Sequence, residues 1–130
     1  MEPKIWGPHA WIFLHTITLN YPENPNQIEK QNYKSFFESL SKILPCDNCR
    51  EHYSENIENI PIDLQSRESL VQWLFTIHNK VNQKNNKQLV NYDDFINQYS
   101  ELYNQKDKNY ILYTILLLIA IILFIIYKKK

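Results

Sequence analysis

The stretch SRESLVQWLFTIHNKVN, residues 66–82, carries the helical pattern on which our fold prediction rests. Ser66 has a side chain of the kind that caps helix N-termini. Apolar residues then recur every three or four positions, the spacing of one face of an α-helix. These residues are Leu70, Trp73, Leu74, Ile77 and Val81. We therefore expect a helix that packs this face against other helices.

Segments on both sides show similar spacing and are separated by helix-ending signals. Tyr21-Pro22 and Pro45 are such signals, because proline cannot continue a helix. No segment alternates long enough to predict a strand. The further helices expected from these patterns span residues 9–20, 26–44, 46–59 and about 92–103. The predicted fold is all-α: a four-helix bundle plus a short fifth helix.

The C-terminal stretch YILYTILLLIAIILFIIY, residues 110–127, contains no charged residue. It is long enough to cross a bilayer, and tyrosines stand near both of its ends. The chain shows no N-terminal signal peptide, so we expect a C-terminal transmembrane anchor with the preceding domain facing the cytosol. A buried core helix is the alternative. The expected organisation is a domain at 1–104, a linker at 105–109, a transmembrane helix at 110–127 and a basic tail at 128–130.

Composition excludes several classes of function. Fourteen acidic and fourteen basic residues give a formal net charge of zero. This balance argues against nucleic acid as the partner. A single glycine excludes a glycine-rich phosphate loop. Two cysteines are too few for a small secreted domain stabilised by several disulfides. The pair is therefore expected to be catalytic or metal-binding.

The pair is Cys46-Asp47-Asn48-Cys49, at the start of a predicted helix. Residues three apart share a helix face, and the N-terminal dipole favours a thiolate, as thiol–disulfide exchange requires. Spacing alone leaves three interpretations open. The cysteines are a redox pair, half of a zinc site completed by His52 and His78, or an inert buried pair.

Two further groups of polar and aromatic residues stand at helical spacing. His78 and Asn82 are four residues apart, with Asn79 beside them, and such groups suit the adenine and ribose of a nucleotide. Trp11 and His15 are also four apart. The simpler interpretations are a helix end reaching polar surface and ordinary core packing.

Taken together, three motifs resemble the FAD-linked sulfhydryl oxidases of the Erv/ALR type. The resemblance runs from about Trp6 to Tyr103. Its motifs are WGPHAW at 6–11 with Leu14-His15 and Tyr21-Pro22, then PCDNC at 45–49, then Trp73-Leu74 with HNKVN at 78–82, Lys84 and Lys87.

The resemblance implies FAD as the cofactor and gives each motif a role. Cys49 would lie against the isoalloxazine ring, and Cys46 would face the substrate. From the first helix, the flavin would be lined by Trp11, His15 and Tyr21. From the fourth helix and the following loop, it would be held by His78, Asn79, Val81 and Asn82, with Lys84 and Lys87 near the ribose or phosphates. The mouth of the pocket would be shaped by Trp6, Gly7 and Pro8, and no metal ligand is implied.

The implied activity is the formation of disulfides in protein substrates, with electrons passing through Cys46–Cys49 and FAD to oxygen, giving hydrogen peroxide. A homodimer is also implied. Family members often carry further cysteine pairs that this sequence lacks, so a substrate or a thioredoxin-like electron donor would reach Cys46 directly. Such minimal forms resemble those of large DNA viruses, and a viral source would imply a host or virion membrane as the location. The alternative functions are a zinc-binding membrane adaptor using Cys46, Cys49, His52 and His78, and a tethered helical scaffold.

Overall fold

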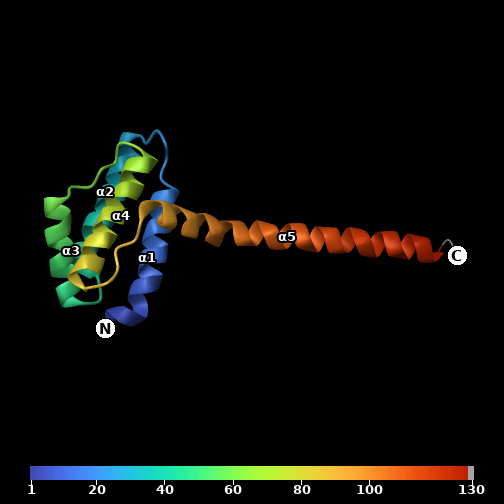
Figure 1. Ribbon diagram of the computed structural model, residues 1–130. Helices are drawn as coiled ribbons and strands as arrows, with labels where there is room; N and C mark the ends of the chain where they lie inside the picture. The colour runs from blue at the N-terminus through green and yellow to red at the C-terminus, as the bar shows by residue number, and fades with distance from the viewer. Residues whose placement is uncertain (129–130) are drawn as a thin grey trace. The chain divides into compact units, whose positions relative to one another are not determined.

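The computed structural model describes residues 1–128, apart from the side chains at 104–109 and 123. Within that part of the chain there are five helices and no strand (Figure 1). The helices are α1 (Pro3–Leu19), α2 (Gln27–Ile43), α3 (Asp47–Asn59), α4 (Arg67–Lys84) and α5 (Tyr92–Lys128). The chain divides into two units, Met1–Leu89 and Val90–Lys130. The all-helical prediction is confirmed.

The first unit is a bundle in which α4 packs against both α1 and α3, while α2 packs against α3 (Figure 1). The apolar face predicted for residues 66–82 is the centre of its core: Leu70, Leu74 and Ile77 are fully buried. The other helices and the α1–α2 loop complete the core with Leu14, Tyr21, Phe37, Leu40 and Tyr53. Aromatic rings supply much of the apolar area that stabilises this small domain.

Three aromatic side chains also tie the backbone together through their polar atoms. The Tyr21 hydroxyl donates to the Leu64 carbonyl at 3.0 Å, and the Tyr53 hydroxyl donates to the Phe37 carbonyl at 3.0 Å. The Trp73 indole N–H donates to the Ile60 carbonyl at 2.9 Å. Each bond satisfies a group that would be costly to bury unpaired. The loops that join the helices are thereby fixed to the core.

Two boundaries differ from the sequence-based predictions. The first helix begins at Pro3 rather than His9, with Pro8 inside it. Pro3 suits the first turn of a helix, and Pro8 removes only one hydrogen bond near that end. The predicted short fifth helix and the linker at 105–109 are instead one continuous helix of 37 residues, Tyr92–Lys128. Of the predicted basic tail, only Lys128 falls within the described residues.

The second unit consists mainly of α5, whose two halves differ in character. In the first half, the Phe95 and Tyr99 side chains are buried, with ring centroids 4.8 Å apart. The stretch Tyr110–Lys128 is apolar, and none of it is buried. Its length and composition are sufficient for a membrane-crossing helix.

Candidate functional site

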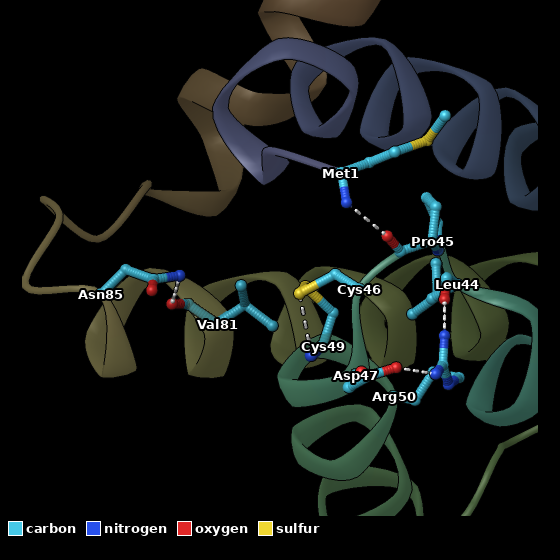
Figure 2. The surroundings of a disulfide bond; sticks show 9 residues. All are labelled: Met1, Leu44, Pro45, Cys46, Asp47, Cys49, Arg50, Val81 and Asn85. Atoms are coloured by element: carbon cyan, nitrogen blue, oxygen red, sulfur yellow. Dashed lines mark hydrogen bonds and ion pairs between the residues drawn. A yellow bond between two sulfur atoms is a disulfide. The ribbon is translucent and has the colours of Figure 1, made fainter.

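The two cysteines form a disulfide at the N-terminus of α3 (Figure 2). Their Cα atoms lie 5.1 Å apart, and both residues are half-buried. Cys46 is the N-cap of α3, and its Sγ accepts a hydrogen bond from the Cys49 N–H at 3.3 Å. An N-cap sulfur of this kind is well placed to carry negative charge when the disulfide is reduced.

The C-terminal part of α4 faces this disulfide. Figure 2 draws Val81 and Asn85 of this helix among the residues around the disulfide, with Val81 the nearer of the two to the sulfurs in this view. Residues at positions i, i+3, i+4 and i+7 share one face of a helix, so His78, Val81, Asn82 and Asn85 line the same side of α4. Asn82 is also buried, at 8% exposure. One helix face therefore connects the disulfide to the residues predicted to hold a nucleotide.

At the other end of that face, α1 and α4 bring together an aromatic cluster of Trp11, His15 and His78. The Trp11 and His78 rings are stacked, with centroids 3.9 Å apart and planes 10° from parallel. The His15 Nε2 and His78 Nδ1 atoms lie 3.0 Å apart, a hydrogen-bond distance. His15 is fully buried. Two sequence motifs separated by 63 residues thus meet in one place.

Burial keeps both histidines neutral at physiological pH. It lowers the pKa of His15 to about 3, with a smaller contribution from the neighbouring His78. Burial also lowers the pKa of His78 to about 4, helped by the positive charge of Lys87. A neutral imidazole has one N–H donor and one acceptor nitrogen. One of the two rings can therefore donate its N–H to the acceptor nitrogen of the other across the 3.0 Å contact.

Lys87 reaches this neighbourhood because the chain turns sharply after α4. Asn86 adopts a left-handed conformation, with φ of 52°. The Asn86 N–H donates to the Gln83 carbonyl, and the Lys87 N–H donates to the Asn82 carbonyl at 2.9 Å. This is a Schellman motif, in which asparagine is a common substitute for glycine. It turns Lys87 back toward the His78 end of α4.

The other predicted site residues have more varied surroundings. The Trp6 indole N–H is buried and has no acceptor among the described residues. A Cβ at Gly7 would meet no atom within 4 Å. Pro8 lies inside α1, Asn79 is half-buried on α4, and Lys84 is exposed in its last turn.

Tyr21 lies two residues beyond the end of α1 rather than on that helix. Its side chain is fully buried, its hydroxyl bonds to the Leu64 carbonyl, and its ring packs edge-on against Tyr33 at 4.5 Å. These contacts belong to the core and to the loop before α4.

The zinc-binding alternative has no support. Over the residues that the structure describes, no group of three or more His, Cys, Asp or Glu side chains is close enough to hold a metal ion. Cys46 and Cys49 are bonded to each other, and a disulfide lacks the thiolates that zinc binds. The expected set of Cys46, Cys49, His52 and His78 is therefore not assembled.

Arg50 is a neighbour of the disulfide that the sequence-based prediction missed. Its guanidinium donates to the Leu44 carbonyl and to the Asp47 carboxylate (Figure 2). The available signal was the position of Arg50 directly after Cys49 and three residues from Asp47, where opposite charges on a helix meet.

Comparisons with known proteins find similar sequences and a similar fold. The sequence model of the Erv1 / Alr family matches residues 8–100. A probable FAD-linked sulfhydryl oxidase of Acanthamoeba polyphaga mimivirus is 37% identical over 112 residues, which cover 84% of this chain and 78% of the viral protein. An FAD-linked sulfhydryl oxidase of African swine fever virus is 30% identical over 96 residues, covering 74% and 81% of the two chains.

A solved structure shows the same fold. The FAD binding domain of Erv1 from Saccharomyces cerevisiae aligns with a TM-score of 0.68 and 32% sequence identity. The alignment covers 70% of this chain and 87% of the yeast chain.

Proposed function

Because the chain belongs to the Erv1 / Alr family, we propose that it is an FAD-dependent thiol oxidase whose Cys46–Cys49 disulfide forms disulfides in protein substrates. The enzyme class and the FAD cofactor follow the names of its relatives. One observation carries the assignment of the redox pair. The disulfide at the start of α3 lies against the α4 face that also carries His78 and Asn82.

The proposed reaction begins with a protein dithiol. A substrate thiolate attacks Cys46 Sγ, the Cys46–Cys49 bond breaks, and Cys49 leaves as a thiolate. The second substrate thiolate attacks the substrate sulfur of the mixed disulfide and releases Cys46. The substrate gains a disulfide, and the cysteine pair holds the two electrons. The N–H groups at the start of α3 favour the thiolate forms.

Bound FAD would supply the two-electron chemistry that links the reduced cysteine pair to oxygen, with hydrogen peroxide as the product. In our proposal the residues that hold it are Trp11, His15, His78, Asn79, Val81 and Asn82. The neutral imidazoles and the Asn82 amide offer donors and acceptors to its polar groups, and the Trp11 ring offers a flat surface.

The residues at the edges of the site have more general roles in the proposal. Lys84 and Lys87 place positive charge where phosphates would lie. Trp6, Gly7 and Pro8 form the mouth, where a Cβ at Gly7 would meet no atom within 4 Å. Tyr21 supports the site from the core through its bond to Leu64.

A spectrum and an oxygen electrode test the activity. Purified in detergent, the full chain should show flavin absorbance and consume oxygen when a dithiol is added. Cys49→Ser should keep the flavin but lose thiol-dependent oxygen uptake, while Asn48→Ser, an exposed change between the cysteines, should retain it. Undiminished oxygen uptake by Cys49→Ser would remove the pair from the mechanism.

We also propose that Tyr110–Lys128 anchors the enzyme in a membrane as a single-pass helix, with the oxidase domain facing the cytosol. The exposed apolar side chains among the described residues of this stretch support the anchor. Two of the relatives are viral proteins, which supports a host or virion membrane as its location.

A homodimer is proposed from the outer surface of α1. Ile5, Ile12 and Phe13 are exposed there by 68%, 44% and 59%, and Phe13 makes an edge contact with Phe36 of α2 at 6.5 Å. An exposed apolar face of this kind is typical of a subunit interface. Phe13→Asp should convert the dimer to a monomer in light scattering, whereas Lys4→Asp at an exposed polar position should not. A wild-type monomer at micromolar concentration would contradict the proposal.

A further inference from the structure

Arg50 bridges the two backbone segments that flank Cys46 (Figure 2). Leu44 is the C-cap that follows α2, and Asp47 is the first residue of α3. The guanidinium donates one hydrogen bond to the Leu44 carbonyl and another to the Asp47 carboxylate. A planar group with several fixed donors is suited to hold two acceptors at once.

Backbone hydrogen bonds hold both ends of the Leu44–Cys46 segment: the Leu44 N–H donates to the Leu40 carbonyl, and the Cys46 carbonyl accepts from the Arg50 N–H. Pro45 has no backbone N–H, so this residue cannot donate a bond. The Cys46 N–H donates to the Leu44 carbonyl at 2.8 Å, and Arg50 fills the second acceptor position of the same oxygen. This turn sets the extended backbone of Cys46, from which its sulfur caps α3 and meets Cys49.

Arg50 also balances a negative charge beside the sulfurs. The Asp47 carboxylate is next to Cys46 in the chain and 90% exposed, and it forms an ion pair with Arg50. An unpaired carboxylate disfavours a nearby thiolate, whereas a permanent guanidinium charge favours it. The neighbours contributed by α4, Val81 and Asn85, are uncharged. The Met1 ammonium, 3.2 Å from the Pro45 carbonyl, is the other cation drawn at this loop.

We propose that Arg50 is a positioning residue that makes the Cys46–Cys49 disulfide more oxidising, by holding the Cys46 turn and neutralising Asp47. The inference rests on the proposed role of this pair in thiol oxidation. It predicts that losing Arg50 stabilises the disulfide relative to the dithiol, so that the pair accepts electrons from substrates less readily.

The test measures the redox equilibrium of the full-length, flavin-loaded protein in detergent. The protein is equilibrated anaerobically with glutathione buffers of graded ratio, and the reduced fraction is read by thiol alkylation and mass spectrometry. Arg50→Met should shift the equilibrium about tenfold toward the disulfide, equivalent to about 30 mV. Arg50→Lys keeps the charge but not the bridge, so it should shift the equilibrium less.

Arg67 offers a matched control. Its guanidinium also bridges a backbone carbonyl and a carboxylate, those of Tyr21 and Glu23, but in a different part of the bundle. Arg67→Met should lower the melting temperature without changing the redox equilibrium. An Arg50→Met equilibrium equal to that of wild type, or shifted no more than that of Arg67→Met, would overturn the inference. If Arg50→Met does not fold, the redox equilibrium of Arg50→Lys is measured instead and compared with those of wild type and Arg67→Lys. A shift no larger than that of Arg67→Lys would overturn the inference.

A second readout separates charge from general structural damage. In the reduced protein, Arg50→Met should move the pH profile of Cys46 alkylation to higher pH, and adding Asp47→Asn should move it back. No return in the double variant would show that charge neutralisation is not involved and would overturn that part of the inference. The redox equilibrium and the alkylation profile are both measured without catalytic turnover. Oxygen uptake that persists in Cys49→Ser would therefore contradict the proposed function but would leave the test of Arg50 unaffected.

Discussion

At the scale of single residues, His78 has two neighbours in the candidate site. It stacks on Trp11 at 3.9 Å and pairs with the buried His15 at 3.0 Å. His78→Ala would leave the His15 imidazole without this partner and remove the ring stacked on Trp11. We expect flavin affinity to fall by roughly fivefold, since one buried hydrogen bond contributes about 1 kcal/mol. Flavin released during ultrafiltration measures this, with the exposed His9→Ala as the control. Full flavin retention by His78→Ala would show that this face of α4 does not bind the cofactor.

The buried histidines also predict how stability depends on pH. The folded pKa of His15 is about 3 and that of His78 about 4, both below the value of 6.5 expected in the unfolded chain. Between these values the unfolded state binds more protons, so stability falls as the pH falls from about 6.5 toward 4. Each fully titrating group contributes a slope of about 1.4 kcal/mol per pH unit.

Urea unfolding of the flavin-free protein at a series of pH values from about 7 to about 5 measures this slope. Unfolded carboxylates titrate mainly below this range, so histidines dominate it. His15→Phe should flatten the profile, whereas His9→Phe should not. A wild-type stability that stays constant across the range would mean that the two imidazoles are not buried as a neutral pair.

The sequence predicted which residue types belong to this site better than it predicted their contacts. Trp11, His15 and His78 were recognised from helical spacing and family resemblance. Their meeting depends on how α1 packs against α4, and no local pattern specifies contact across 63 residues. The role of Tyr21 in the core and the bridge made by Arg50 were not predicted, because both depend on carbonyl groups that side-chain patterns do not reveal.

At the scale of structural elements, the turn after α4 depends on Asn86. Its positive φ of 52° is tolerated by asparagine and glycine but strained for β-branched residues. Asn86→Val should therefore destabilise the domain by about 1–2 kcal/mol, while Asn86→Gly should be close to neutral. Urea unfolding checks both. Because the turn also directs Lys87 toward His78, Asn86→Val should weaken flavin binding as well. Equal stability of the two variants would contradict the left-handed assignment.

Element boundaries were predictable where side chains mark them. Asn26 forms a capping box with Glu29, Ser66 caps α4, and Pro45 precedes α3, so α2, α3 and α4 were placed within about a residue. The first helix was predicted to start at His9, too late by six residues, since α1 begins at Pro3 and contains Pro8. The fifth helix was predicted to end too early, because the polar composition of residues 105–109 suggested a linker, while polar residues can also continue a helix.

At the scale of the whole molecule, the question is whether the apolar part of α5 serves a membrane or the fold. Tyr110–Lys128 has 19 residues and so measures about 28 Å as a helix, close to the thickness of a bilayer core of about 30 Å. None of it is buried. Deleting residues 110–130 should therefore remove nothing from the bundle core. The shortened chain is expected to remain in the supernatant after membranes are pelleted, and to keep flavin and thiol-dependent oxygen uptake.

A single charged substitution tests membrane anchoring more specifically, because the chain keeps its full length. Leu118→Arg places a charge near the centre of the segment, where it costs about 2.5–3.5 kcal/mol on insertion scales, whereas Leu118→Ile changes little. Carbonate extraction should release the arginine variant from membranes and leave the isoleucine variant bound. If instead the deletion yields an insoluble protein without flavin, the segment stabilises the folded enzyme. Because the bundle core is formed by residues of the first unit, we expect the activity to survive without the anchor.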